Sequence, residues 1–84
     1  TDPKQAWAQE NLRDLPVEVN KVGRNELLRV PGIGPKGANA ILRARQQSKL
    51  RSVSSLKKLG VIAERAAPFV LLDGKRAPTQ MALF

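Results

Sequence analysis

Apolar residues recur along this chain at the spacing of short amphipathic helices. The clearest such segment begins at Pro35 and extends to about Gln47. One of its faces is mostly apolar, at the spacing i, i+3, i+4, i+7, and comprises Ala38, Ile41, Leu42 and Arg45. Another face is basic and polar and comprises Lys36, Asn39, Arg43 and Gln46. The pattern predicts a helix that packs through the first face and exposes the second.

Two shorter helices are expected before this segment. Pro3 is suited to a first helical turn, and Lys4–Leu12 then carries Trp7, which we interpret as a core or interdomain anchor rather than a base-stacking residue. A second short helix is expected over Arg24–Val30. Its inward residues are Leu27, Leu28 and Val30.

Two further helices are expected after it. Ser52 is a favourable cap for a short helix whose apolar residues are Val53, Leu56 and Leu59. A helical pattern resumes at Ile62 and continues to about Leu72, and Pro68 should kink or shorten it.

The remaining stretches predict no helix. Val17–Asn20 alternates but is too short to make a sheet alone, so we expect an extended connector, and Asp73–Thr79 has the composition of a tail. The predicted fold is all-α, a compact bundle of about five short helices with a flexible C-terminal tail. The predicted divisions are an N-terminal helix and connector (1–16), a helical domain (17–73) and a basic, polar tail (74–84).

The most informative stretch is the glycine-rich turn within Val30–Ala38. Gly32 and Gly34 permit a positive φ angle or the close approach of another molecule, and Pro35 suits the first position of a helix. Backbone N–H groups at such a helix start can hold a phosphate. The alternative is a tight turn whose glycines serve packing alone.

The chain also repeats itself at an offset of 28 residues, the separation of Gly32 and Gly60. Besides these glycines, the aligned pairs are Leu28 with Leu56, Ile33 with Val61, Ala38 with Ala66, and Ile41 with Phe69. Each copy predicts a helix, a glycine-centred turn and a second helix. The second copy is degenerate, because Ile62 replaces Gly34 and Glu64 replaces Lys36.

Charge and composition narrow the class of partner. Fifteen Lys and Arg against seven Asp and Glu give a net charge of +8, an excess that favours a polyanion. No apolar run approaches the roughly 18 residues of a spanning helix, and no signal peptide is visible, so we expect nucleic acid rather than a membrane. The chain has no Cys and no His, which removes disulfides, zinc sites and iron–sulfur ligands. We expect no cofactor in this fragment and a cytoplasmic location.

The residues Leu27–Ala38, followed by Ile41, closely resemble the helix-hairpin-helix DNA-binding motif, because Pro-Gly-apolar-Gly and the later Ala and Ile occur at the expected spacing. With the degenerate second copy, residues 17–72 resemble the tandem helix-hairpin-helix domain of competence DNA receptors and Holliday-junction branch-migration proteins. The whole chain is also similar to the C-terminal part of bacterial radical-SAM proteins assigned to DNA modification or repair.

The resemblance implies a monomeric, nucleoid-associated module that binds DNA phosphates without sequence specificity, while any chemistry is supplied by an upstream part of a larger protein. Arg43 and Lys58 join the expected contacts because helix or turn geometry can place them near a hairpin. The expected DNA-binding residues are Gly32, Ile33, Gly34, Lys36, Gly37, Arg43, Lys58, Gly60 and Val61. For the second turn, a purely structural role is equally open. The family sometimes holds a monovalent cation on the hairpin carbonyls, and no other metal is expected.

Two other classes of function stay open. The end of the chain resembles the bacterial sliding-clamp-binding pentapeptide, through Gln80, Met81, Leu83 and Phe84, which favours a protein-interaction module; a tail that packs on its own domain is the alternative. An enzyme is less consistent with the sequence. Lys36 occupies the Schiff-base position of some DNA glycosylases, but the only later Asp is Asp73, and the domain is too small to enclose a flipped base.

Overall fold

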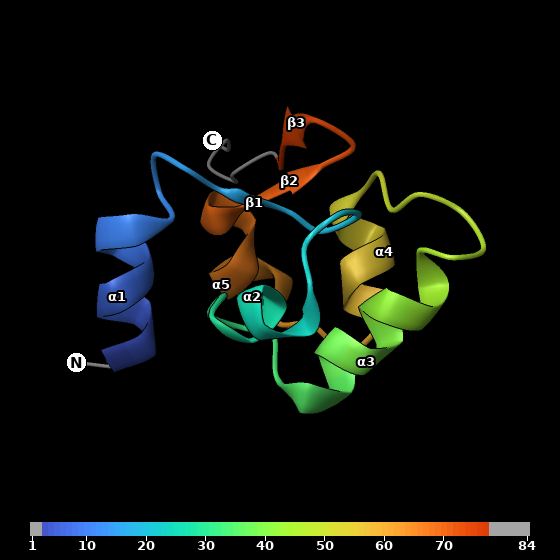
Figure 1. Ribbon diagram of the computed structural model, residues 1–84, viewed down its shortest axis with the longest axis horizontal. Helices are drawn as coiled ribbons and strands as arrows, with labels where there is room; N and C mark the ends of the chain where they lie inside the picture. Colours follow the sequence, from blue (N-terminus) through green and yellow to red (C-terminus); the bar gives the residue numbers. More distant parts are fainter. Residues whose placement is uncertain (1–2, 78–84) are drawn as a thin grey trace.

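The computed structural model describes residues 3–77, which fold into five α-helices and a small sheet (Figure 1). In chain order the helices are α1 (Pro3–Asn11), α2 (Arg24–Leu28), α3 (Pro35–Ala44), α4 (Val53–Lys58) and α5 (Ala63–Ala66). The mainly helical fold expected from the hydrophobic pattern is confirmed. Helices α2, α3 and α5 are shorter than predicted, and α3 ends three residues before Gln47.

The prediction of an all-α fold is wrong in one respect, because three short strands form a sheet at the top of Figure 1. The strands are β1 (Val17–Glu18), β2 (Val70–Leu72) and β3 (Lys75–Arg76). β1 runs parallel to β2, with Val17 opposite Val70, and β3 runs antiparallel to β2. A two-residue segment is no sheet by itself, but pairing with a strand from the far end of the sequence satisfies its backbone groups.

A two-residue turn at Asp73 and Gly74 joins β2 to β3. The φ angles of these residues are 55° and 81°, and two positive φ angles allow a tight hairpin turn to match the twist of its strands. Lys75 and Arg76, which the sequence assigned to a flexible tail, are therefore part of a paired strand. The candidate clamp-binding peptide, Gln80–Phe84, lies outside the described residues.

The helical pattern that begins near Ile62 also ends earlier than expected. α5 stops at Ala66 and is followed by a 3-10 turn over Ala67–Phe69. Pro68 has no N–H to donate to the preceding turn, and its ring crowds that turn, so the predicted interruption is confirmed. The residues beyond it form β2 rather than more helix.

The core lies between the two halves of the chain. Leu27 and Ile33 from the first half and Leu56 and Phe69 from the second are almost completely buried, and Ile41 joins them from α3. Burying one such side chain stabilises the fold by about 1.5–3 kcal/mol. Because the cluster draws on both halves, each half positions the turn of the other.

The predicted faces of α3 are confirmed. Ala38 and Ile41 are fully buried, whereas Lys36 and Arg43 are exposed. Arg45, the polar member of the inward face, donates through Nη1 to the carbonyl oxygens of Val19 and Val22 at 2.9 and 2.6 Å. This charge-assisted contact holds the loop that leads into α2 against the end of α3.

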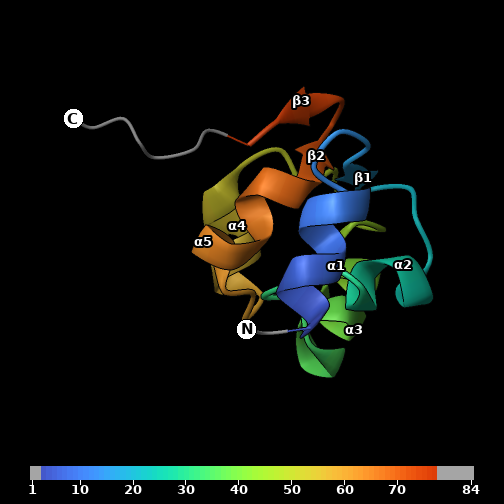
Figure 2. The same ribbon diagram turned by 90° about the vertical axis from the view of Figure 1, so that its left-hand side faces the viewer.

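Helix α1 packs beside the core, in front of it in Figure 2. Its buried residue is Ala8, and Leu12, which directly follows the helix, is buried four positions later on the same side. Trp7 lies off that face and is 38% exposed, so the interpretation of Trp7 as a core anchor is wrong. Its ring lies instead under the Arg29 guanidinium, with 5.5 Å between the guanidinium carbon and the ring centroid.

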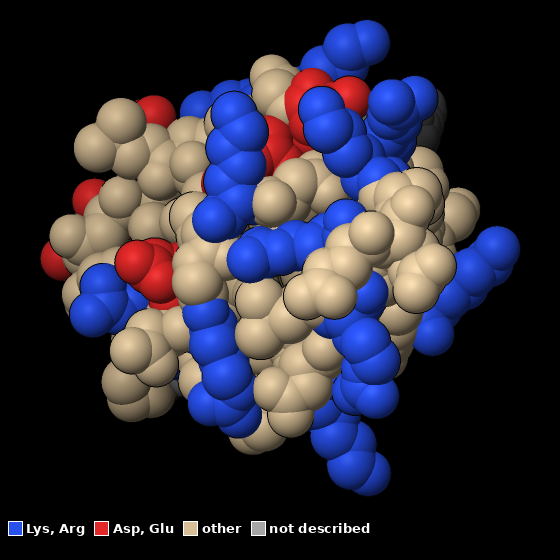
Figure 3. Space-filling view, turned by 45° about the vertical axis from the view of Figure 1, so that its right-hand side comes forward, with Lys and Arg blue, Asp and Glu red and all other residues tan. Residues whose placement is uncertain are grey.

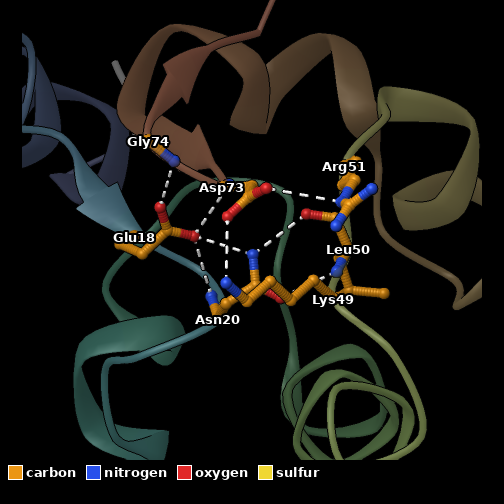
Figure 4. Close-up of polar contacts among 7 residues, drawn as sticks. All are labelled: Glu18, Asn20, Lys49, Leu50, Arg51, Asp73 and Gly74. Carbon is orange, nitrogen blue, oxygen red and sulfur yellow. Dashed lines mark hydrogen bonds and ion pairs between the residues drawn. The ribbon is translucent and has the colours of Figure 1, made fainter.

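A polar cluster closes the sheet end of the molecule (Figure 4). The Glu18 carboxylate accepts hydrogen bonds from the backbone N–H of Gly74 at 2.6 Å, from that of Asp73 at 3.1 Å, and from the backbone and side chain of Asn20 at 3.1 and 2.8 Å. The Asn20 amide also bonds the backbone of Leu50 in both directions, at 2.9 and 2.7 Å. Burial raises the pKa of Glu18, but these hydrogen bonds outweigh it and hold the pKa below its ordinary value of 4.5.

Candidate nucleic-acid interface

Local backbone geometry forms the turn between α2 and α3. The Ile33 N–H donates to the Val30 carbonyl at 3.1 Å, and Gly32 has a φ angle of +88°, in the left-handed region that glycine adopts at little cost. Gly34 then precedes α3 in an extended conformation, and Pro35 is the first helical residue. The chain thus reverses direction and starts a new helix within a few residues.

The turn between α4 and α5 repeats the glycine conformation of the first turn. Gly60 has the same φ angle as Gly32, +88°. Ile62 precedes α5 in an extended conformation, as Gly34 precedes α3, and α5 starts at Ala63, which is 28 residues after Pro35. The repeat seen in the sequence therefore has a counterpart in the φ angles of the two glycines and in the positions of the two helix starts, although the ψ angles of Gly34 and Ile62 differ, at −174° and 90°.

The two turns contact each other directly. The Ile62 N–H donates to the Gly32 carbonyl oxygen at 3.0 Å. A Cβ atom on Gly32 would lie 2.4 Å from the Ile62 carbonyl oxygen and 3.3 Å from the Ala66 nitrogen, so this position has no room for a side chain. Gly37 packs similarly, because a Cβ there would lie 3.3 Å from Val61 Cγ2. At Gly32 and Gly37 a packing role is therefore present whatever else these residues do.

The start of α3 is the most open part of the first turn. Gly34 is exposed, and a Cβ built on it would meet no atom within 4 Å. Gly34 is the cap residue of α3 and has no side chain to accept from the first helical N–H groups, those of Lys36 and Gly37. These N–H groups lie at the positive end of a ten-residue helix, a favourable place for a phosphate oxygen. The exposed Lys36 adds a full positive charge.

The second turn offers less to an anion. Gly60 is also exposed and open, but Val61 is 5% exposed, and the cap position carries Ile62 with 52% of its surface exposed. α5 has only four residues, and its first turn contains the acidic Glu64. A carboxylate at that position repels a phosphate.

Basic side chains spread over the face of the molecule that carries α3 and α4, while acidic ones gather at its upper and left edges (Figure 3). Lys36 and Arg43 are seven residues apart on the exposed face of α3, and Lys58 is the last residue of α4, just before the second turn. Of the expected DNA-binding residues, the exposed ones are Gly34, Lys36, Arg43, Lys58 and Gly60. Ile33, Gly37 and Val61 are buried, so any contact by them is through the backbone.

A hollow of about 230 Å³ lies at the first turn. It is lined by Lys4, Gly32, Ile33, Gly34, Ile62 and Arg65. The Lys4 ammonium donates to the Ile33 carbonyl oxygen there, at 2.9 Å. In the sequence Lys4 is only part of a helix start, and no local pattern marks its contact with a turn 29 residues away.

The described residues do not assemble the site that a glycosylase would need. The first turn of α3 lies at the lower end of the molecule in Figure 1, whereas the β2–β3 turn that contains Asp73 lies at the upper end. Asp73 forms ion pairs there with Lys49 at 3.4 Å and Arg51 at 3.3 Å. Residues 3–77 contain no group of three or more acidic side chains placed to hold a metal ion. Within the same range, no helix is long and apolar enough to cross a bilayer.

Comparison with known proteins identifies one family. A family model described as helix-hairpin-helix motif matches residues 14–69, which is more than half of the 84-residue chain. The match includes both turns and begins after α1. No curated protein and no solved structure matched the chain.

Proposed function

The chain belongs to the helix-hairpin-helix family, and we propose that it is a monomeric module that binds the DNA backbone through the amides of its glycine turns. The motif is commonly involved in non-sequence-specific DNA binding. Contacts from amides to phosphates position a protein on DNA and do not distinguish one base from another. The net charge of +8 supports a polyanionic ligand.

The start of α3 is the observation that carries this proposal. It combines an open glycine, two N–H groups at the positive end of a helix and the exposed Lys36. A phosphate oxygen placed there would accept hydrogen bonds from the N–H groups while Lys36 neutralises its charge. Gly34 leaves room for that approach, which any larger residue would restrict.

The second turn is proposed as a weaker phosphate contact, so that the domain acts as a tandem of two hairpins. The equal φ angles of Gly32 and Gly60 support this reading, and Glu64 accounts for the weaker contact. If the two turns together engage about four phosphates, the logarithm of the binding constant should fall with the logarithm of salt concentration at a slope of roughly −3.6 for duplex DNA. Fluorescence anisotropy with labelled duplexes measures that slope, and duplexes of unrelated sequence should give the same affinity.

A valine at Gly34 tests the proposed phosphate site. In Gly34→Val the branched side chain covers the start of α3, and we expect affinity for duplex DNA to fall at least about tenfold, or about 1.4 kcal/mol. The matched control is Gly23→Val, because Gly23 also caps a helix in an extended conformation. There a new Cβ would meet only the flexible end of Glu26, at 3.1 Å.

The control variant should bind as the wild type does, and circular dichroism should report the same helix content for both variants. Equal affinities for Gly34→Val and the wild type, or no binding by the wild type at low salt, would reject the proposed function. Borohydride trapping on abasic DNA that depended on Lys36 would replace it with an enzymatic function.

We also propose that this module acts inside the cell as an accessory to a larger DNA modification or repair protein. The supporting observation is the resemblance of the chain to the C-terminal part of such proteins. A clamp-binding role for Gln80–Phe84 is a second candidate, and it rests on the sequence of that peptide alone. Binding to a bacterial sliding clamp that survives the double change Leu83→Ala and Phe84→Ala would exclude it.

A further inference from the structure

Helix α1 makes an unexpected contact with the first turn. Lys4 lies in the first turn of α1, outside the residues that match the helix-hairpin-helix model. Its ammonium group nevertheless reaches the carbonyl oxygen of Ile33, which lies between the two glycines of the turn, at 2.9 Å. Lys4 is half-buried, so this charge is partly withdrawn from solvent.

The family resemblance implies a monovalent cation on the carbonyl oxygens of the turn, and Ile33 O, which the Lys4 ammonium contacts, is one of these oxygens. A backbone carbonyl oxygen is a hard, neutral ligand, and it attracts an ammonium group and an alkali-metal ion by the same electrostatics. A positive charge on Ile33 O also offsets the negative end of that carbonyl, which would otherwise repel an approaching phosphate. A lysine ammonium group on this oxygen therefore provides the same positive charge as a bound metal ion. The lysine charge is part of the chain, whereas a metal ion must bind from solution.

The same charge borders the proposed phosphate site. Lys4 lines the hollow that contains Gly34, together with Arg65 from α5. Lys4 also lines a neighbouring hollow of about 320 Å³, whose other residues are Trp7, Leu28 and Arg29. The contact of Arg29 with the Trp7 ring also joins α1 to the end of α2, so two contacts hold α1 near the first turn.

We propose that Lys4 is the resident cation of the first turn: its ammonium group occupies the Ile33 carbonyl in place of a monovalent metal ion and presents its charge to the DNA phosphate bound at the start of α3. This inference rests on the proposed DNA-binding function. It makes α1 a part of the DNA-binding unit. Affinity for DNA then depends on ionic strength but not on which monovalent cation is present.

The first test uses the wild-type protein. Binding to one labelled duplex is measured by fluorescence anisotropy at a single ionic strength in the chlorides of potassium, sodium, lithium and tetramethylammonium. The expected result is a dissociation constant that stays within about twofold across the series. A loss of tenfold or more in tetramethylammonium relative to potassium overturns the proposal, since it would show that a small free ion is required.

The second test removes the ammonium group. Lys4→Ala should weaken binding about threefold to fivefold in tetramethylammonium chloride, as for the loss of one partly exposed ion pair, and should flatten the salt slope by about 0.9. Potassium or sodium should restore part of the lost affinity, because a small ion can now reach Ile33 O. The matched control is Lys21→Ala, which removes the same charge from an exposed loop residue and should show no dependence on the identity of the cation.

A purely structural role for Lys4 predicts a different result. If the lysine only holds α1 in place, Lys4→Ala and Lys21→Ala differ in thermal stability, and neither responds to the identity of the cation; that result overturns the proposal. If Lys4→Ala does not fold, the wild-type cation series still decides the question. The absence of any DNA binding by the wild type would instead reject the proposed function, so the two failures are distinguishable.

Discussion

The two glycine turns share the φ angle of the glycine that reverses the chain and differ in what surrounds it. Gly32 and Gly60 have the same φ angle, and each is followed by an extended residue and a helix start. Only the first turn combines an open cap position, a long helix and a lysine in the first helical turn. The glycine with positive φ and the glycine at the helix cap therefore have different roles. The glycine with positive φ reverses the chain, whereas the glycine at the helix cap leaves the N–H groups accessible.

The largest expected effect is a difference in stability between alanine substitutions at the two glycines with positive φ, Gly32 and Gly60. Gly32→Ala would place an alanine in a left-handed backbone conformation, which costs about 1–2 kcal/mol of stability. Its Cβ would also lie 2.4 Å from the Ile62 carbonyl oxygen, and such overpacking costs about 1–3 kcal/mol more. Gly60→Ala carries only the first cost, because its Cβ would meet nothing within 4 Å. Urea unfolding should therefore show a loss of about 2–5 kcal/mol for the first variant and about 1–2 kcal/mol for the second. Equal losses would contradict the packing of the two turns against each other.

The next largest effect is a change in DNA affinity when the charges that distinguish the two turns, at Lys36 and Glu64, are altered. Lys36→Gln removes a positive charge from the start of α3, and Glu64→Lys places one at the equivalent position of α5. We expect the first change to weaken DNA binding and flatten the salt slope by about 0.9, and the second to strengthen binding and steepen the slope by a similar amount. Anisotropy titrations at several salt concentrations measure both. If Glu64→Lys left the slope unchanged, the second turn would lie outside the DNA contact.

The smallest effect concerns the end of the molecule away from both turns. Because the folded pKa of Glu18 lies below 4.5, its contribution to stability is complete above the unfolded pKa and is lost as the pH falls through the folded value. Glu18→Gln should cost about 1 kcal/mol at neutral pH, as for one lost hydrogen bond, and the deficit should shrink below about pH 4.5. Chemical unfolding across this pH range tests it. DNA affinity at neutral pH should stay unchanged, which would separate the fold from the proposed site.

Features that depend on neighbouring residues could be predicted from the sequence. Ser52 was expected to cap α4, and its side chain accepts from the Ser55 N–H at 3.3 Å. The start of α3 at Pro35 and the interruption at Pro68 follow equally from the covalent limits of proline. The same holds for the reversal at Gly32, where the glycine, the proline and the following helix form one local pattern.

Features that depend on distant residues could not be predicted in this way. β1 is too short to be recognised as a strand, and its partner β2 lies near the other end of the chain. Asp73-Gly74 is a local signal for a hairpin turn. The hairpin forms, however, only because β3 can pair with β2. The contact of Lys4 with Ile33 spans 29 residues and depends on how α1 docks. The exposure of Trp7 has the same origin, since Ala8 and Leu12 set the rotation of that helix.

The direction of α1 has a consequence for joining this domain to other proteins. The helix begins beside the first turn, as the Lys4 contact requires, whereas β3 lies at the opposite end of the molecule in Figure 2. A fluorescent label or a fused domain attached ahead of α1 would start beside the surface proposed to bind DNA. The same attachment after β3 would start from the far side and leave that surface accessible.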